Sequence, residues 1–177
     1  AAAHSFLPLS HPLTTAMGVT LAAAAHHAGW PMVAGGSQRL AEAMAERVLV
    51  GGAPFLGICV GMQLLASRGV EHGVSEGLGW IEGEVHRIAV TDPAIKIPHM
   101  GWNDVMPCGG ASLVEAGEAY FLHSFAFAGD DVLATTSHGG EIVASIGRDN
   151  RIGVQFHPEK SQHYGLAMLE RFLRWRP

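Results

Sequence analysis

The chain has 177 residues, a formal net charge of −5 and 15% charged residues, against roughly a quarter in an average soluble domain. This length is enough for one domain with a sizeable core, and the negative charge without a basic cluster argues against nucleic acid as a partner. The apolar stretch 16–25 is too short to span a membrane and has no basic flank, so we expect neither a membrane protein nor a signal peptide.

The cysteines and histidines narrow the class of protein further. Cys59 and Cys108 are the two cysteines; they give no disulfide framework and suit a reducing compartment, so we expect a cytoplasmic protein. The 11 histidines do not fall at zinc-ligand spacings beside Cys or Glu pairs. We therefore expect no metal site.

The first 46 residues predict helices rather than strands. Thr14 or Thr15 can cap a helix that runs to about Ala28, where a Gly-Trp-Pro sequence stops it. Gly35-Gly36-Ser37 then predicts the start of a second helix.

The segment Pro54–Leu65 carries the first chemical signal. Its apolar run Phe55–Ile58 predicts a buried strand, and the apolar residues after Gly61 predict a helix. Cys59 lies between two glycines at this strand-to-helix turn, which is the elbow arrangement of hydrolases with cysteine in place of serine. We expect the helix N-terminus to lower the pKa of the thiol. A buried structural cysteine is the alternative for this segment taken alone.

Strands dominate the prediction for the middle of the chain. Ser67–Gly79 is rich in glycine and charge and predicts a loop. Alternating or β-branched runs then predict strands at Trp80–Val90, Ile95–Ile97, Tyr120–Phe125, Val132–Thr136 and Ile142–Ile146. The last two are separated by a Gly-containing turn and predict a hairpin.

A second chemical signal follows about a hundred residues after Cys59. Alternating apolar residues lead up to His157, as in a strand that delivers its last side chain to a sheet edge, and Glu159 falls on the same side of an extended chain. A carboxylate there can fix the imidazole tautomer, which would complete a set of nucleophile, base and orienting group. Ser161 then predicts the cap of a final helix with one apolar face.

Four segments carry a resemblance to a known family. They are Gly57-Ile-Cys-Val-Gly-Met-Gln63, Pro98-His-Met-Gly-Trp-Asn103, Tyr120-Phe-Leu-His-Ser-Phe125 and Gln155-Phe-His-Pro-Glu-Lys160. Residues 47–177 resemble a class I glutamine amidotransferase and, more narrowly, the glutaminase subunit of imidazole glycerol phosphate synthase. The second segment is the one that is similar to this histidine-biosynthesis branch. The resemblance implies a three-layer α/β fold around a mainly parallel sheet.

The resemblance also implies roles for individual residues. Cys59 is implied as the nucleophile, His157 as the acid–base and Glu159 as its orienting carboxylate, with the Val60 N–H as an oxyanion donor. Glutamine contacts are implied for Gly57, Gln63, His123, Ser124 and Phe125. A partner interface is implied for Pro98, His99, Met100, Gly101, Trp102, Asn103 and Lys160.

The implied reaction is hydrolysis of L-glutamine to glutamate and ammonia, without a cofactor. The ammonia would pass to a barrel-shaped cyclase subunit in a heterodimer that serves histidine biosynthesis. Three alternatives stay open: an amidotransferase subunit of the anthranilate or aminodeoxychorismate type, a cysteine hydrolase of the dienelactone type, and a catalytically impaired truncated or fused amidotransferase.

Residues 1–46 differ from the usual start of this family. That start supplies parallel strands, one of the type Ile-Ile-Asp-Tyr-Gly and another ending in a Pro-Gly-Val-Gly segment that helps to form the oxyanion hole. Neither motif is in this sequence. His4–Thr14 and Gly29–Gln38 are similar instead to FAD-dependent phytoene-desaturase-like oxidoreductases, although the flavin fingerprint Gly-x-Gly-x-x-Gly is absent.

We therefore predict an atypical helical segment over residues 1–46 and an amidotransferase domain over residues 47–177. The change of resemblance predicts a junction between residues 40 and 50, as in a fused chain; a divergent family N-terminus is the alternative. Loss of one oxyanion donor is expected to lower the rate about 10²–10³-fold.

Overall fold

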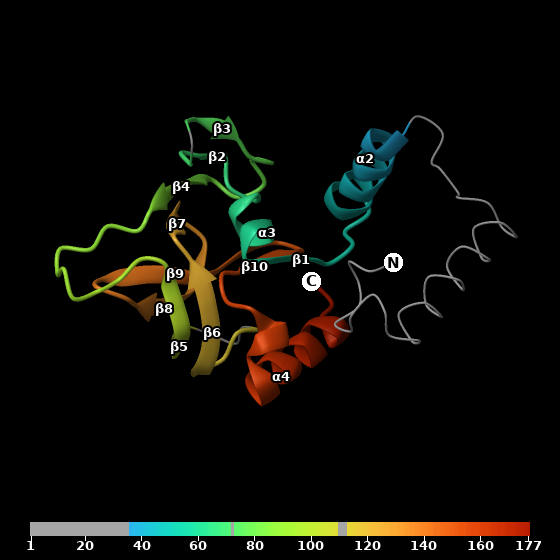
Figure 1. Ribbon diagram of the computed structural model, residues 1–177. Coiled ribbons are helices and arrows are strands. Elements are labelled where there is room, and N and C mark those ends of the chain that lie inside the picture. Colours follow the sequence, from blue (N-terminus) through green and yellow to red (C-terminus); the bar gives the residue numbers. More distant parts are fainter. Residues whose placement is uncertain (1–35, 72, 110–112) are drawn as a thin grey trace, which may run out of the picture. The chain divides into compact units, whose positions relative to one another are not determined.

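A computed structural model describes residues 36–71, 73–109 and 113–177 (Figure 1). The chain divides into two units, Ala1–Glu46 and Arg47–Pro177. The helix predicted near residues 14–28 lies outside the described residues, as does most of the segment that is similar to flavin-dependent oxidoreductases. The second predicted helix is present as α2, Gly36–Leu49. Among the described helices, none has the length and apolar character needed to cross a membrane.

A six-stranded sheet forms the framework of the second unit. Its strands lie in the order β1-β10-β9-β8-β5-β6. They are β1 (Phe55–Ile58), β5 (His99–Pro107), β6 (Gly117–His123), β8 (Val132–Ser137), β9 (Glu141–Arg148) and β10 (Arg151–Val154). In this sheet β1 and β10 pair in parallel, and all other neighbours are antiparallel.

The α/β class is as predicted, but the expectation of a mainly parallel sheet is wrong for the described residues. Strands β8, β9 and β10 follow one another through turns of a few residues, and such turns join antiparallel strands. A parallel pair needs a long crossover connection. The connection between β1 and β10 contains all the other described strands of the unit.

A second, smaller sheet has the order β3-β2-β4-β7. Its strands are β2 (Arg68–Gly69), β3 (Ser75–Glu76), β4 (Gly83–Arg87) and β7 (Phe125–Gly129). The predicted loop at Ser67–Gly79 therefore contains two strands, which are too short to show a period in sequence. The strand predicted at Ile95–Ile97 is absent, whereas the predicted hairpin is confirmed as β8 and β9.

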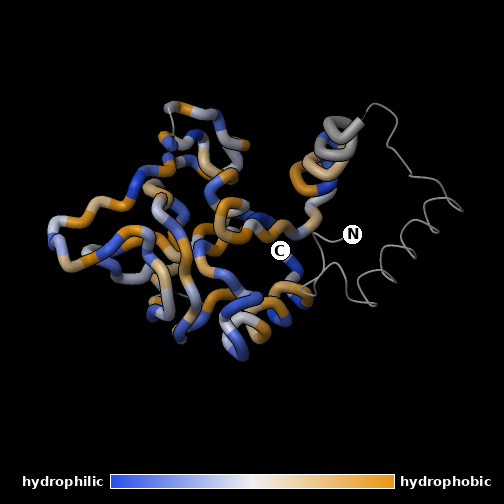
Figure 2. The backbone as a smooth tube through the Cα atoms, in the orientation of Figure 1, coloured by the Kyte–Doolittle hydropathy of each residue, from blue (hydrophilic) through white to orange (hydrophobic). Residues whose placement is uncertain are grey.

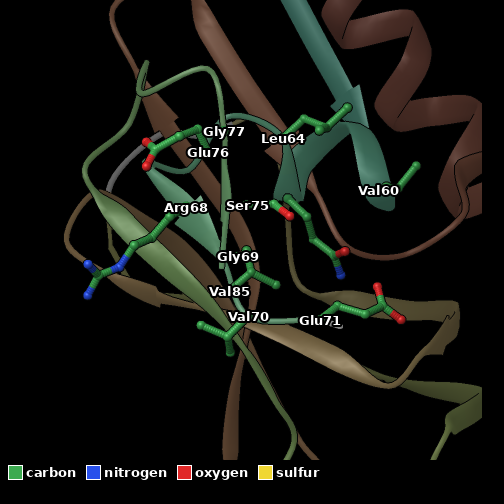
Figure 3. A pocket seen from close by; sticks show the side chains of 11 residues that line it. Val60, Leu64, Arg68, Gly69, Val70, Glu71, Ser75, Glu76, Gly77 and Val85 are labelled. Atoms are coloured by element: carbon green, nitrogen blue, oxygen red, sulfur yellow. The ribbon is translucent and has the colours of Figure 1, made fainter. Parts of the chain in front are cut away.

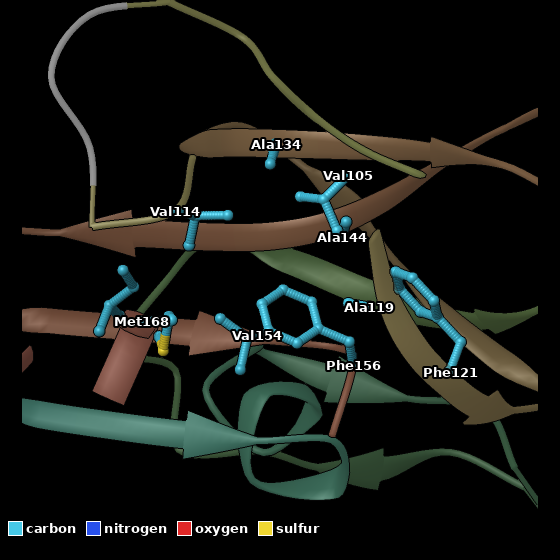
Figure 4. Close-up of a cluster of buried hydrophobic side chains, with 10 residues drawn as sticks. Val105, Val114, Ala119, Phe121, Ala134, Ala144, Val154, Phe156 and Met168 are labelled. Carbon is cyan, nitrogen blue, oxygen red and sulfur yellow. The ribbon is translucent and has the colours of Figure 1, made fainter. Parts of the chain in front are cut away.

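One hydrophobic cluster fills the space between the larger sheet and the last helix, α4 (Gln162–Arg174) (Figure 4). Phe121, Phe156 and Met168 are fully buried in it. Tyr164 and other apolar residues of α4 pack against this cluster, as the apolar face of the predicted helix required. Figure 2 shows hydrophobic and hydrophilic residues side by side along α4, as expected for a helix with one buried face.

A second cluster fixes the short helix α3 (Val60–Gln63) at the end of β1. Met62 and Leu65 are fully buried there, together with Ile146 of β9. Met62 lies directly over Gly153 of β10, where an added Cβ would come within 2.6 Å of the Met62 Cγ. Close packing of α3 on the sheet therefore sets the position of the residue between β1 and α3.

Candidate active site

Cys59 occupies the predicted elbow between β1 and α3. Its backbone has φ 52° and ψ −109°, a strained conformation for a residue other than glycine. The Cys59 N–H donates to the Val154 carbonyl at 2.8 Å, and its own carbonyl accepts from the N–H of Met62 at 3.1 Å. These bonds hold the strained turn against β10. The helix that follows is shorter than predicted, with a single turn.

The Cys59 thiol is half-buried and has two polar neighbours besides its own helix. It donates to the Leu122 carbonyl at 3.9 Å and accepts from Nε2 of Gln155 at 3.7 Å. Burial raises the pKa of the thiol, while a hydrogen bond from the Val60 N–H lowers it and the charge of Glu159 raises it. We expected a lowered pKa; burial outweighs the field of a helix that has only one turn.

His157 and Glu159 form the predicted pair. His157 follows the sheet strand and begins the 3₁₀ helix η2 (Pro158–Lys160), and its N–H donates to the Tyr120 carbonyl at 2.9 Å. Its Nδ1 lies 2.7 Å from Oε1 of Glu159. A carboxylate accepts, so Nδ1 carries the proton and Nε2 keeps its lone pair for a proton of the substrate or nucleophile. In this state the hydrogen bonds of the described residues include none between His157 and Cys59.

Two glutamine side chains lie between the elbow and the neighbouring strands. Nε2 of Gln63 donates to the Phe125 carbonyl and to Oε1 of Gln155, both at 3.0 Å. Gln155 is fully buried, and we assigned it no role from sequence. The signal that could have found it is a polar residue in an otherwise apolar run just before His157, because a buried amide needs partners.

His99, predicted at the partner interface, and His123, predicted to contact glutamine, are buried together where β5 begins and β6 ends. His99 Nδ1 lies 3.0 Å from His123 Nε2, and Asn103 Nδ2 lies 3.0 Å from His99 Nε2. Burial, together with His123 and His138, lowers the pKa of His99 to about 3. Burial also lowers the pKa of His123. Both imidazoles are therefore neutral at pH 7.

A cavity of about 320 Å³ lies beside α3 (Figure 3). This volume is within the range of roughly 300–1,000 Å³ for small-molecule sites. Gln63 lines it from α3, and Arg68, Glu71 and Glu76 line it from the smaller sheet and its connection. These three charged residues fall in the segment that we predicted as a loop. His123, Ser124 and Phe125 are not among the lining residues, so only Phe125 is tied to this region, through its carbonyl bond to Gln63.

The outer side of β5 presents large apolar side chains. Met100 is 60% exposed and Trp102 is 47% exposed, whereas His99, which precedes Met100 and points to the other side of the strand, is buried. Trp102 meets the Tyr120 ring edge-on at 6.2 Å, and Lys160 Nζ lies 5.7 Å from the centre of the same ring. The predicted interface residues thus divide into an exposed set, with Pro98 and Lys160, and an inward set, with His99, Gly101 and Asn103.

Comparison with known proteins gives the family. The family model for glutamine amidotransferase class-I matches residues 31–175. The imidazole glycerol phosphate synthase subunit HisH of Zymomonas mobilis is 57% identical over 142 residues, covering 78% of this chain and 67% of that protein. The protein of the same name from Rhodospirillum rubrum is 51% identical over 150 residues, covering 80% and 70%.

A solved structure described as a glutamine amidotransferase has a TM-score of 0.52 and 23% identity, covering 72% of this chain and 65% of that one. The family match begins at residue 31, so residues 31–46 fall inside it. None of these findings supports the predicted junction or the likeness to a flavin-dependent oxidoreductase. The extent of the match and the high identity place this chain in the class-I glutamine amidotransferase family.

Proposed function

We propose that this chain hydrolyses glutamine as the glutaminase subunit of an imidazole glycerol phosphate synthase, supplying ammonia for histidine biosynthesis in the cytoplasm. Two observations carry the proposal together: the cysteine elbow between β1 and α3, and the His157 imidazole whose Nδ1 lies 2.7 Å from Glu159. The family and the high identity to HisH subunits support the choice of reaction. The alternative of an ester-cleaving cysteine hydrolase has no comparable support.

The chemistry proceeds in two steps. His157 Nε2 takes the thiol proton, and the Cys59 thiolate attacks the side-chain amide carbon of glutamine, with the Val60 N–H donating to the developing oxyanion. The imidazolium gives its proton to the departing ammonia, which leaves a γ-glutamyl thioester. His157 then takes a proton from water as the water attacks the thioester, and glutamate leaves while the thiol regains its proton.

The raised pKa of the thiol fits a site that is idle until it is completed. In the described state the thiol proton lies toward the Leu122 carbonyl rather than toward His157. Catalysis requires a movement of His157 or of the elbow that exchanges that acceptor for Nε2. Docking of a partner can supply such a movement.

The cavity beside α3 is the proposed glutamine site; Val60 and Gln63 line it next to the elbow, whereas Cys59 and His157 are not among its lining residues. Both N–H groups of the Gln63 amide donate to protein atoms, so its Oε1 is the atom that can accept from a ligand. The carboxylates of Glu71 and Glu76 line the same cavity and suit the α-ammonium group of an amino acid. Arg68 contributes its guanidinium mainly to Glu84, at 2.6 Å.

The exposed face of β5 is the proposed docking surface for the cyclase subunit. Met100 and Trp102 offer apolar area, and Lys160 offers a positive charge next to them. Lys160 follows Glu159 directly, so contact at this surface is one residue from the catalytic carboxylate.

The test is glutamate release from glutamine by the purified chain, with and without a cyclase subunit from one of the HisH-carrying organisms. The Cys59→Ala variant is the control. We expect release that depends on both Cys59 and the partner. Release that persists in Cys59→Ala, or a soluble folded chain that is inactive with its partner, would overturn the proposal.

A further inference from the structure

A continuous hydrogen-bonded path joins the Cys59 sulfur to the inward side of β5. From Asn103 it runs through His99, His123, the Phe125 carbonyl, Gln63 and Gln155 to the sulfur. All links are 2.8–3.0 Å long except the last, from Gln155 to sulfur, which is 3.7 Å. The path starts in the same strand that carries Met100 and Trp102 on its opposite side.

The proton positions along the first half of the path follow from its carbonyl acceptors. His123 Nδ1 must donate to the Phe125 carbonyl, so its Nε2 accepts and the proton between the two imidazoles belongs to His99 Nδ1. His99 Nε2 then accepts from Asn103. The amide orientation of Asn103 is fixed because its Nδ2 also donates to the Ser137 carbonyl, at 2.8 Å. One arrangement of protons satisfies every bond.

The second half of the path decides what the sulfur faces. Both N–H groups of the Gln63 amide donate, one to the Phe125 carbonyl and one to Oε1 of Gln155. Because Oε1 of Gln155 is held in this way, its Nε2 points to the Cys59 sulfur. If the amide of Gln155 turned over, its oxygen would face the sulfur and its NH₂ group would face the NH₂ group of Gln63. A donor stabilises a thiolate, and an acceptor does not.

We propose that Gln155 is a catalytic residue that donates to the Cys59 sulfur, with its orientation set by Gln63. Asn103, His99 and His123 are positioning residues that hold, from β5, the Phe125 carbonyl to which Gln63 donates. This inference rests on the proposed role of Cys59 as nucleophile. The same bonds would connect the docking face of β5 to the proposed nucleophile. A partner that shifts β5 would alter the hydrogen bonds of Asn103 and His99 and, through them, the surroundings of the Cys59 sulfur.

The test measures the thiol itself and needs neither glutamine nor partner. In a Cys108→Ser background, the rate of Cys59 alkylation by iodoacetamide is followed from pH 5 to 10. The charged groups that face the sulfur, Glu159 and Lys160, are unchanged in every variant. We expect Gln155→Met to raise the thiol pKa by about one unit, a tenfold loss of thiolate at neutral pH.

Variants in β5, away from the sulfur, test the proposed positioning role of Asn103. Asn103→Ala should raise the thiol pKa by a smaller amount in the same direction, whereas Asp104→Ala, an exposed neighbour on the opposite side of β5, should not. An unchanged profile in Gln155→Met overturns the role of Gln155. An unchanged profile in Asn103→Ala overturns the path from β5.

A spectroscopic measurement on the unaltered protein avoids any loss of folding in the variants. Imidazole ¹⁵N shifts should show His99 and His123 both neutral and both protonated at Nδ1 at pH 7. Protonation of either ring at Nε2 alone would overturn the proposed order. Because neither measurement involves glutamine, an inactive glutaminase would leave both results interpretable.

Discussion

The two glycines that flank Cys59 should respond very differently to the same substitution. An added Cβ at Gly57 would lie 2.5 Å from the Gly61 carbonyl oxygen and 2.8 Å from the Met62 nitrogen. Both are backbone atoms, which cannot turn aside as a flexible side chain can. An added Cβ at Gly61 meets no atom within 4 Å. Gly57 is thus required for the close approach of β1 to α3; the substrate contact that we predicted for it stays a prediction.

The magnitude follows from the size of the clash. Ordinary contact requires α3 to move away from β1 by roughly 1 Å, and overpacking of this kind costs about 3 kcal/mol of the free energy of unfolding. For a unit of this size that lowers the thermal midpoint by about 10 °C. A shift of about 1 Å at a nucleophile lowers activity about 10²-fold. Gly61→Ala lies in a helix and should be neutral or stabilising by about 0.5 kcal/mol.

The assay is urea unfolding of both variants beside the unaltered chain, followed by Cys59 alkylation at one pH. We expect a loss of stability and of alkylation rate in Gly57→Ala and neither in Gly61→Ala. Equal destabilisation by the two substitutions would refute the argument, because it would mean that the flanking glycines serve backbone freedom rather than close approach.

Three further predictions concern His157, His99 and the turn that leads from α2 into β1. Glu159→Gln should lower kcat for glutamine by about 10²-fold, less than for a buried carboxylate because Glu159 is 55% exposed; an unchanged kcat would remove its orienting role toward His157. The depressed pKa of His99 means that the unfolded chain binds its proton below about pH 6.5 and the folded chain only near pH 3. Stability should therefore fall as pH drops below 6.5 in urea titrations, and less steeply in His99→Gln; parallel curves would contradict this. Asn150→Ala should lower the free energy of unfolding by about 1–3 kcal/mol, because its Nδ2 donates to two backbone carbonyls, at 2.6 and 2.7 Å, on either side of the turn into β1; a loss below about 0.5 kcal/mol would mean that water replaces these bonds.

The local patterns of the sequence were enough to predict the strand-to-helix elbow at Cys59 and the contact between His157 and Glu159. Cys59 between glycines and Glu159 two residues after His157 are short-range arrangements, in which spacing alone decides which side chains can meet. The apolar face of the last helix and the hairpin of β8 and β9 follow for the same reason. In each case the partners are close in sequence, or their period matches one regular structure.

Tertiary structure decided everything that depends on partners far apart in the chain. The sheet direction depends on which strands become neighbours, and the mainly parallel sheet implied by the resemblance was wrong for the described strands. The pKa of Cys59 depends on how deeply the thiol is buried, so the local argument from the helix N-terminus was wrong as well. Gln155 had no distinctive spacing, yet burial gave it two partners, each more than ninety residues away in sequence. The resemblance implied an interface role for His99, and only the tertiary structure shows that its side chain is buried against His123. Because burial and long-range pairing set the free-energy cost of every polar group, the fold rather than the motif determines which of these residues lie against the Cys59 sulfur.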